Sequence, residues 1–209
     1  MNDRDRILNR LRATRRPFNA LPAVDERRHM VPLDDVSSAA LRERFIHEAE
    51  KLACQVWSAE SDGEAVAKLR DLLGDDKQVL AWETGAIGLT GLAEMLDTSG
   101  VSITAPNDPD TRVGITGVDG ALAATGSLVL ASGVGKPRAV SLLPPVHIAV
   151  LRAGQIVADM ETWFMENRAL VQASSNITVI SGPSRTADIA LELVMGAHGP
   201  RELHVLLLP

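Results

Sequence analysis

The sequence contains no tyrosine, a single cysteine and few aromatic residues of any kind. Because only 3% of the residues are aromatic, aliphatic side chains must build the core, and a surface that stacks single-stranded nucleic acid on aromatic rings is disfavoured. Cys54 has no partner for a disulfide within the chain, which is typical of a reducing compartment. One thiolate also cannot hold an iron–sulfur cluster, so we expect no cofactor on this chain.

Long hydrophobic runs are missing as well. The longest runs, such as VLLL at 205–208, are far shorter than a membrane-spanning helix. The N-terminal segment lacks the apolar stretch of a signal peptide, and Asp3 and Asp5 argue against an organelle transit peptide. We therefore expect a cytoplasmic protein without a membrane span.

Motifs of metal centres and serine hydrolases are not found. His29, His47, His147 and His204 show no metal-ligand spacing with carboxylates or with one another, so no metal site is predicted. The G-x-S-x-G sequence of one large hydrolase class is also missing.

Charge is distributed unevenly along the chain. The net charge is −6, but residues 1–30 hold eight arginines against four acidic residues, a charge of +4 that leaves −10 for residues 31–209. RDRILNRLRATRR has the pattern of a short amphipathic helix, and a proline-punctuated linker follows it. We predict a basic arm at 1–35 that contacts a partner protein or a second copy, ahead of an acidic domain at 36–209; a solvated helix face is the alternative. The acidic domain disfavours nucleic acid as a partner.

The domain is expected to begin with a helix that is capped by Ser37 or Ser38. Its apolar stripe consists of Leu41, Phe45, Ala49, Leu52 and Val56. A helix of that length includes Cys54, which we interpret as a packed, unreactive thiol.

Beyond this helix, helical and strand patterns alternate, which predicts a parallel sheet covered by helices on both faces. The expected helices lie at 61–73, 89–97 and 158–170, and the expected strands at 78–82, 101–104, 139–144, 146–151 and 176–181. Glycines recur every few residues in RVGITGVDGALAATGSLVLASG, 112–133, which favours short strands and tight turns.

The C-terminal segment has a different pattern. We expect a turn at 182–186, a strand near 189–195, a second turn at 196–201 and a closing strand at 203–208. A helical turn that starts at Ser184 is the alternative.

Glycine-rich loops follow several of the expected strands, where open α/β sheets bind their ligands. TGAIGLTG at 84–91 lacks the dinucleotide-binding spacing, and GVGK at 133–136 lacks the rest of a phosphate-binding loop and is interpreted as a hairpin. In ATGSL at 124–128, the hydroxyls of Thr125 and Ser127 flank Gly126, where a backbone without a side chain lets a ligand approach closely.

The segment SGPSRT at 181–186 is the strongest candidate for binding an anion. Ser181, Gly182, Ser184 and Thr186 supply hydroxyls and backbone N–H groups that can form an anion-binding nest, and Arg185 supplies a guanidinium fork for a carboxylate or phosphate.

Two further residues near this segment are candidates for catalysis. Asp188 can orient the arginine or transfer a proton, and His198 in GAHGP is the natural proton carrier near neutral pH. A purely structural role in turns and caps is the alternative for all of these residues.

These stretches resemble a known family. RVGITGVDGALAATGSLVLASG and ITVISGPSRTADIALELVMGAHGPRELHVLLLP are similar to the two signature regions of the LUD-domain family, specifically its lactate utilization protein C branch. The resemblance covers essentially the whole chain. It implies a three-layer α/β/α fold with a sheet like those of ribose-phosphate isomerases and CoA transferases.

The resemblance also implies a function. Proteins of this type take part in the oxidation of L-lactate to pyruvate together with two partner proteins, which carry the iron–sulfur clusters. We therefore expect a non-redox subunit of such a complex, which binds a small carboxylate or another anion. A homo-oligomer is a further option for its assembly. Many relatives have an acidic residue at the position of Ala124, and its loss here favours binding over independent chemistry. The alternative is a stand-alone isomerase, transferase or cyclo-ligase that acts on a phosphorylated or CoA-linked substrate.

Overall fold

The computed structural model describes residues 3–14, 33–187, 193–196 and 198–209. The chain divides into two compact units, Met1–Met30 and Val31–Pro209. In the first unit, the described residues form the expected helix α1 (Asp3–Thr14), in which Arg6 pairs with Asp3 one turn earlier. The fold of the second unit is described below.

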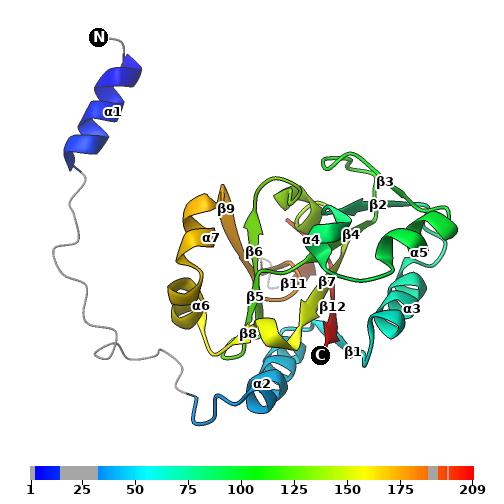
Figure 1. Ribbon diagram of the computed structural model, residues 1–209. Helices are drawn as coiled ribbons and strands as arrows, with labels where there is room; N and C mark the ends of the chain where they lie inside the picture. Colours follow the sequence, from blue (N-terminus) through cyan, green and yellow to red (C-terminus); the bar gives the residue numbers. More distant parts are fainter. Residues whose placement is uncertain (1–2, 15–32, 188–192, 197) are drawn as a thin grey trace. The chain divides into compact units, whose positions relative to one another are not determined.

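The described strands of the second unit include a parallel six-stranded sheet (Figure 1). Its strands, in spatial order, are β1 (Gln55–Ser58), β12 (Glu202–Leu208), β7 (Val146–Arg152), β4 (Val113–Gly117), β2 (Gln78–Ala81) and β3 (Ser102–Ile103). The central strands β7, β4 and β12 are buried over nearly their whole length, as parallel strands covered on both faces must be. This explains the aliphatic runs in β7 and β12.

Helices flank this sheet, so the predicted α/β class with a parallel central sheet is confirmed. They are α2 (Ser38–Lys51), α3 (Asp62–Leu73), α4 (Thr84–Ile87), α5 (Leu92–Thr98) and the 3-10 helices η2 (Arg138–Ser141) and η3 (Ala153–Gln155). α4 and η2 cover opposite faces of β4, and each packs on a glycine of that strand. A Cβ atom on Gly117 would meet the backbone of Ile87, and one on Gly114 would overlap the carbonyl oxygen of Val140.

A second sheet with four strands packs beside the first. It contains β8 (Ile156–Val157), β5 (Gly120–Leu122), β6 (Ser127–Ser132) and β9 (Asn176–Ile180), in that order. Alternate side chains point to opposite faces: Leu128 joins the main core, whereas Leu122 and Val129 pack on Trp163. Trp163 belongs to α6 (Met160–Glu166), which covers this sheet together with α7 (Arg168–Ala173), at the opposite end of the unit from α3 and α5 (Figure 1).

Three expectations about local structure are wrong. The first helix of the domain, α2, ends at Lys51, and Ala53 adopts a φ of 65°. Cys54 therefore precedes strand β1 instead of lying in a helix. The aliphatic residues of 139–144 enter and follow η2, because the segment must turn back over β4 before β7 begins. The helix expected at 158–170 is two helices, with Asn167 as the last cap of α6 and the first cap of α7.

The C-terminal hairpin also differs in part from the prediction. Residues 185–187 form strand β10 (Arg185–Ala187) instead of the end of a turn, because they pair with β11 (Leu193–Met195) in antiparallel register. β11 falls within the strand expected near 189–195, whose residues 188–192 lie outside the described ranges. The closing strand is confirmed as β12.

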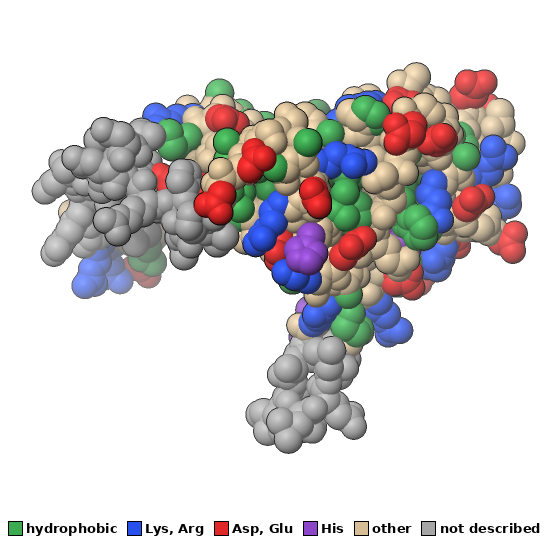
Figure 2. All heavy atoms as spheres, turned by 90° about the horizontal axis from the view of Figure 1, so that it is seen from below, with side chains coloured by type: hydrophobic (Ala, Val, Ile, Leu, Met, Phe, Trp, Pro, Cys, Tyr) green, Lys and Arg blue, Asp and Glu red, His purple; other side chains and the backbone are tan. Residues whose placement is uncertain are grey.

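The surface of the second unit is mixed in charge. Figure 2 shows acidic and basic side chains interspersed over one face, with scattered hydrophobic side chains between them. None of the helices in the described ranges combines the length and hydrophobicity that a membrane crossing requires.

Candidate functional site

The chain topology identifies one edge of the main sheet as a ligand crevice. β2 and β4 are neighbours, but the chain leaves β2 toward β3 on one side and leaves β4 toward β7 on the other. Because such crossovers are right-handed, these two connections cover opposite faces of the sheet. Ligands of open α/β sheets bind beyond the carboxyl ends of strands at such a point.

An ion pair lies at this point. Asp119 follows β4, and its Oδ1 accepts a 2.6 Å hydrogen bond from Nζ of Lys136, while its Oδ2 accepts one of 2.8 Å from the backbone N–H of Ala131. The Asp119 side chain is 9% exposed and that of Lys136 is 25% exposed. The backbone of Ala131 therefore holds the carboxylate in place. The ammonium group of Lys136 keeps access to solvent and has further protons to donate.

The residues that follow β2 surround the lysine. Nζ of Lys136 lies 5.0 Å from the ring centroid of Trp82, which is buried. The backbone N–H of Glu83 donates to the carbonyl oxygen of Gly135, and a Cβ atom on Gly135 would lie 2.6 Å from the carboxyl group of Glu83. Gly135 has a φ of 72°, so this turn favours glycine for its conformation.

A cleft of about 750 Å³ opens beside the ion pair, between the turn at 132–138 and the segment 173–176. We call it the Lys136 cleft. Lys136 and Arg138 line it, and no Asp or Glu is among its described lining residues. In the part of the chain that the structure describes, no hydrogen bond or ion pair engages the Arg138 side chain. An ammonium group and a guanidinium that has no described partner, both in one cleft, are suited to binding an anion.

The sequence interpretation missed this cleft. The GVGK segment does form the expected tight turn, closed by a bridge between Gly133 and Lys136. Its chemistry depends on Asp119, which lies on another element and becomes the partner of Lys136 only in the folded chain. The local signal was a pair of cations, Lys136 and Arg138, that lie close together in the sequence of an otherwise acidic domain.

The loops predicted to bind an anion do converge. Ser127 donates to or accepts from both Thr125, at 2.9 Å, and Ser181, at 2.8 Å, through the side-chain hydroxyls. Ser127 is buried, so its hydroxyl satisfies its bonding potential within this chain of hydroxyls. The loops belong to the four-stranded sheet and not to the carboxyl edge of the main sheet.

These loops pack against the C-terminal end of α2. A Cβ atom on Gly126 would overlap the backbone nitrogen of Ala49, and one on Gly182 would lie 2.7 Å from the carbonyl oxygen of Leu52. Arg185 donates a 2.6 Å hydrogen bond to that same carbonyl oxygen. A helix C-terminus carries partial negative charge, so Arg185 complements it, as basic residues at helix ends do. Anion binding by these residues stays a prediction.

Cys54 lies next to this region and is 6% exposed. Burial raises the pKa of its thiol to about 11, against a smaller lowering by Arg185. The thiol is therefore neutral and unreactive near pH 7, as expected for a packed cysteine.

Of the two catalytic candidates, the structure describes only His198, and it does not line the Lys136 cleft. His198 is exposed in the segment that precedes β12, at the amino edge of the main sheet. Asp188 lies outside the described residues, as does the Thr186 side chain. Ser184 meets the histidine's segment: its backbone N–H donates to the carbonyl oxygen of Pro200, and Gly199 packs on its side chain.

The glycine-rich loop at 84–91 is fastened by ion pairing. Arg152, at the end of β7, donates to both carboxylate oxygens of Asp62 and to the carbonyl oxygen of Gly88. Hydrogen bonds from Thr90, followed by those from Arg152, hold the pKa of the Asp62 carboxyl below its usual value. These contacts connect α3, the loop and β7, and indicate a structural role for the loop.

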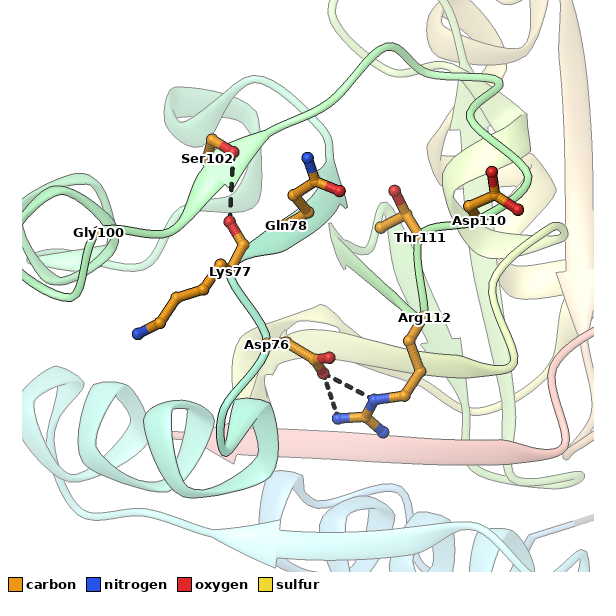
Figure 3. Close-up of a pocket in the computed structure, with 8 residues that line it drawn as sticks. All are labelled: Asp76, Lys77, Gln78, Gly100, Ser102, Asp110, Thr111 and Arg112. Atoms are coloured by element: carbon orange, nitrogen blue, oxygen red, sulfur yellow. Dashed lines mark hydrogen bonds and ion pairs between the residues drawn. The ribbon is translucent and has the colours of Figure 1, made fainter.

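A smaller cavity of about 380 Å³ lies at the amino ends of β2, β3 and β4 (Figure 3). Arg112 points across it to Asp76, with a 2.7 Å bond from Nε, and its Nη2 also donates to the carbonyl oxygen of Leu72. The arginine is thus already neutralised, and the cavity lies at the edge opposite the crevice. Among the described residues, no group of three or more His, Cys, Asp or Glu side chains is arranged to hold a metal ion.

The fold and the cleft together define an α/β protein with a cationic crevice at the carboxyl edge of a parallel sheet. A sequence model of the LUD domain matches residues 42–208, which is most of the chain. The chain belongs to the LUD-domain family.

Individual relatives agree with this assignment. The chain is 41% identical over 95 residues to the uncharacterized protein NMB1437 of Neisseria meningitidis, which covers 44% of this chain and 40% of that one. It is 38% identical over 135 residues to lactate utilization protein C of Shouchella clausii, which covers 59% of each. The chain therefore spans about half the length of these curated relatives. The crystal structure of a DUF162 family protein from Deinococcus radiodurans has a TM-score of 0.63 and 22% identity, covering 84% of this chain and all of that chain, and so shares the fold.

Proposed function

We propose that this chain acts in lactate utilization as a non-redox protein that binds a small carboxylate. The LUD domain and the relatives named lactate utilization protein C support the process. The Lys136 cleft supports the binding, because it is lined by Arg138, which has no described partner, and by the ammonium group of Lys136, near the topological crevice. L-Lactate and pyruvate, which both carry one carboxylate, are the ligands that this proposal names.

The observation that carries the proposal is the pairing of Lys136 with Asp119 beside Arg138, whose side chain has no partner among the described residues. Asp119 uses one ammonium proton and orients the lysine, which leaves other protons for a ligand carboxylate. Arg138 then supplies a second, bidentate contact. The partly buried position of the lysine strengthens these interactions, since they are less screened by water than on an open surface.

Two iron–sulfur proteins are proposed as partners in the oxidation of lactate. The single, buried cysteine supports a role without a cluster on this chain. In this arrangement, the chain holds or delivers the carboxylate, and the partners transfer the electrons.

Binding of the carboxylate is tested by calorimetry with L-lactate and pyruvate. Arg138→Gln removes a cation that has no described partner, so the fold should be unaffected and affinity should fall about tenfold or more. Arg70→Gln, on the exposed surface of α3, is the matched control and should bind as the wild type does. Equal affinity in the wild type and Arg138→Gln, or no binding of either acid, would contradict the proposal.

A second candidate is suggested by the size of the cleft. About 750 Å³ is within the range that accommodates a drug-sized ligand, and much of it would remain unfilled by lactate. A phosphorylated or CoA-linked substrate would use both the cations and the volume, as in a stand-alone isomerase, transferase or cyclo-ligase. Competition between pyruvate and CoA or ribose 5-phosphate, measured on the wild type, separates the two: tight binding of the larger ligand alone favours the second candidate.

A further inference from the structure

A second cleft, of about 570 Å³, lies at the amino ends of β7 and β12. One wall follows η2, and the other consists of Gly196, His198, Gly199 and Arg201. We call it the Arg201 cleft. The Arg201 cleft and the Lys136 cleft share no lining residue, so a ligand bound in one cleft does not fill the other.

The wall that follows η2 is apolar and accessible. Leu142 is 37% exposed and Leu143 is 50% exposed, and Pro145 continues the same surface. Single exposed leucines are common on protein surfaces and need no explanation. Two adjacent ones that line a cleft form a continuous apolar patch, which typically marks an interaction site.

The opposite wall is basic. His198 and Arg201 line it and are exposed, and no Asp or Glu is among the described lining residues. In the described part of the chain, no ion pair engages Arg201.

The backbone holds both walls in position. The N–H of Arg201 donates a 2.7 Å bond to the carbonyl oxygen of Pro145, and the N–H of Gly196 donates a 2.8 Å bond to Ser184. A Cβ atom on Gly196, whose φ is 74°, would overlap Cγ of Arg201, so this glycine gives the arginine stem its room. The cleft is thus preorganised, which reduces the entropy lost on binding.

We propose that the Arg201 cleft is a docking surface for a partner protein, which inserts a segment with carboxylates next to aliphatic side chains. The aliphatic side chains pack on Leu142 and Leu143, and the carboxylates pair with Arg201 and His198. Charge complementarity selects an acidic segment, since a basic one would be repelled. A protein segment fits both walls, because it can present aliphatic side chains to the leucines and carboxylates to the basic residues at the same time.

The probe for this surface is a fluorescein-labelled synthetic peptide of alternating aspartate and leucine, and binding to the full chain is followed by fluorescence anisotropy. We expect binding that Arg201→Glu weakens about tenfold or more, because it replaces an attraction by a repulsion. Arg70→Glu has the same charge change on exposed α3 and should leave binding within about twofold. Leu143→Ala should also weaken binding, whereas Val36→Ala, at a valine that is 62% exposed and lines neither cleft, should not.

Further measurements distinguish this surface from the carboxylate site. A peptide with lysine in place of aspartate should not bind, and neither pyruvate nor Arg138→Gln should change the affinity for the acidic peptide. The proposal is overturned if the acidic peptide does not bind, or if Arg201→Glu and Arg70→Glu weaken it equally. It is also overturned if octanoate binds in an Arg201-dependent way and the peptide does not, since the cleft would then take a small acid. Each result leaves the carboxylate proposal to its own test.

Discussion

His147 should make the folded protein lose stability as the pH falls. Its imidazole on β7 is completely buried, and Nε2 lies 2.8 Å from the hydroxyl of Thr116 on β4. Nδ1 has no hydrogen-bond partner among the described residues. Burial lowers the pKa of His147 from 6.5 to about 3, because the imidazolium would lose its hydration without gaining a counter-charge.

The magnitude follows from linkage between protonation and folding. The pKa of this histidine is lower in the folded than in the unfolded state, so the unfolded chain takes up the proton first as the pH falls below 6.5. The contribution of His147 to the free energy of unfolding is therefore fully present above pH 6.5. It declines toward pH 3, by at most about 1.4 kcal/mol per pH unit. Between pH 7.5 and pH 5, the loss amounts to about 2 kcal/mol, which depends on the unfolded-state pKa because the folded imidazole is still neutral at pH 5.

Urea unfolding at pH 7.5 and pH 5 measures this loss. His147→Gln keeps a polar group near Thr116 but does not titrate, so its stability should fall by about 2 kcal/mol less than that of the wild type over this interval. Burial also lowers the pKa of His204, which remains in both proteins, so its contribution cancels. His47→Gln, at an exposed histidine of α2, is the control and should follow the wild type.

The reasoning is refuted if the wild type and His147→Gln lose the same free energy between the two pH values. The comparison concerns the change with pH, so a lower stability of the variant at pH 7.5 does not affect it. His147→Asn serves as a second non-titrating variant if the glutamine does not fold.

Three further predictions concern the packing, the thiol and the arm. Gly126→Ala should lower the free energy of unfolding by about 2 kcal/mol or more in urea titrations, because it combines a φ of 63° with overlap of α2, whereas Gly154→Ala, which meets nothing, should have little effect. Cys54 should react with a thiol reagent at pH 8 only as fast as the protein opens, and a rate that approaches that of free cysteine would contradict its raised pKa. Deletion of residues 1–30 should leave the melting temperature of the remaining unit unchanged. It should abolish the salt-sensitive association with a partner protein or a second copy, as followed by gel filtration. A large drop in melting temperature would show that the arm supports the fold.

Much of the site depends on contacts that no local pattern encodes. Thr125 and Ser127 are neighbours in the sequence, so their proximity is expected, but Ser181 reaches them only because β6 and β9 pair in antiparallel register. Arg185 looked like an anion ligand from its residue type, and the fold places it on the last carbonyl groups of α2. A side chain's role depends on what the fold puts opposite it, which a single sequence does not reveal.

The sequence by itself determined the α/β class, most strands and the inert cysteine. Long apolar runs such as β7 and β12 must be buried on both faces, and the serine before α2 caps it whatever surrounds it. These features follow from short-range sterics and from the hydrophobic effect acting on each segment. Only the tertiary structure decided where α2 ends, since its apolar stripe continues past Lys51 into strand β1, which pairs with β12. It also decided that Lys136 meets Asp119, because the carboxylate precedes β5 and the lysine follows β6, and the antiparallel pairing of these two strands brings the charges together.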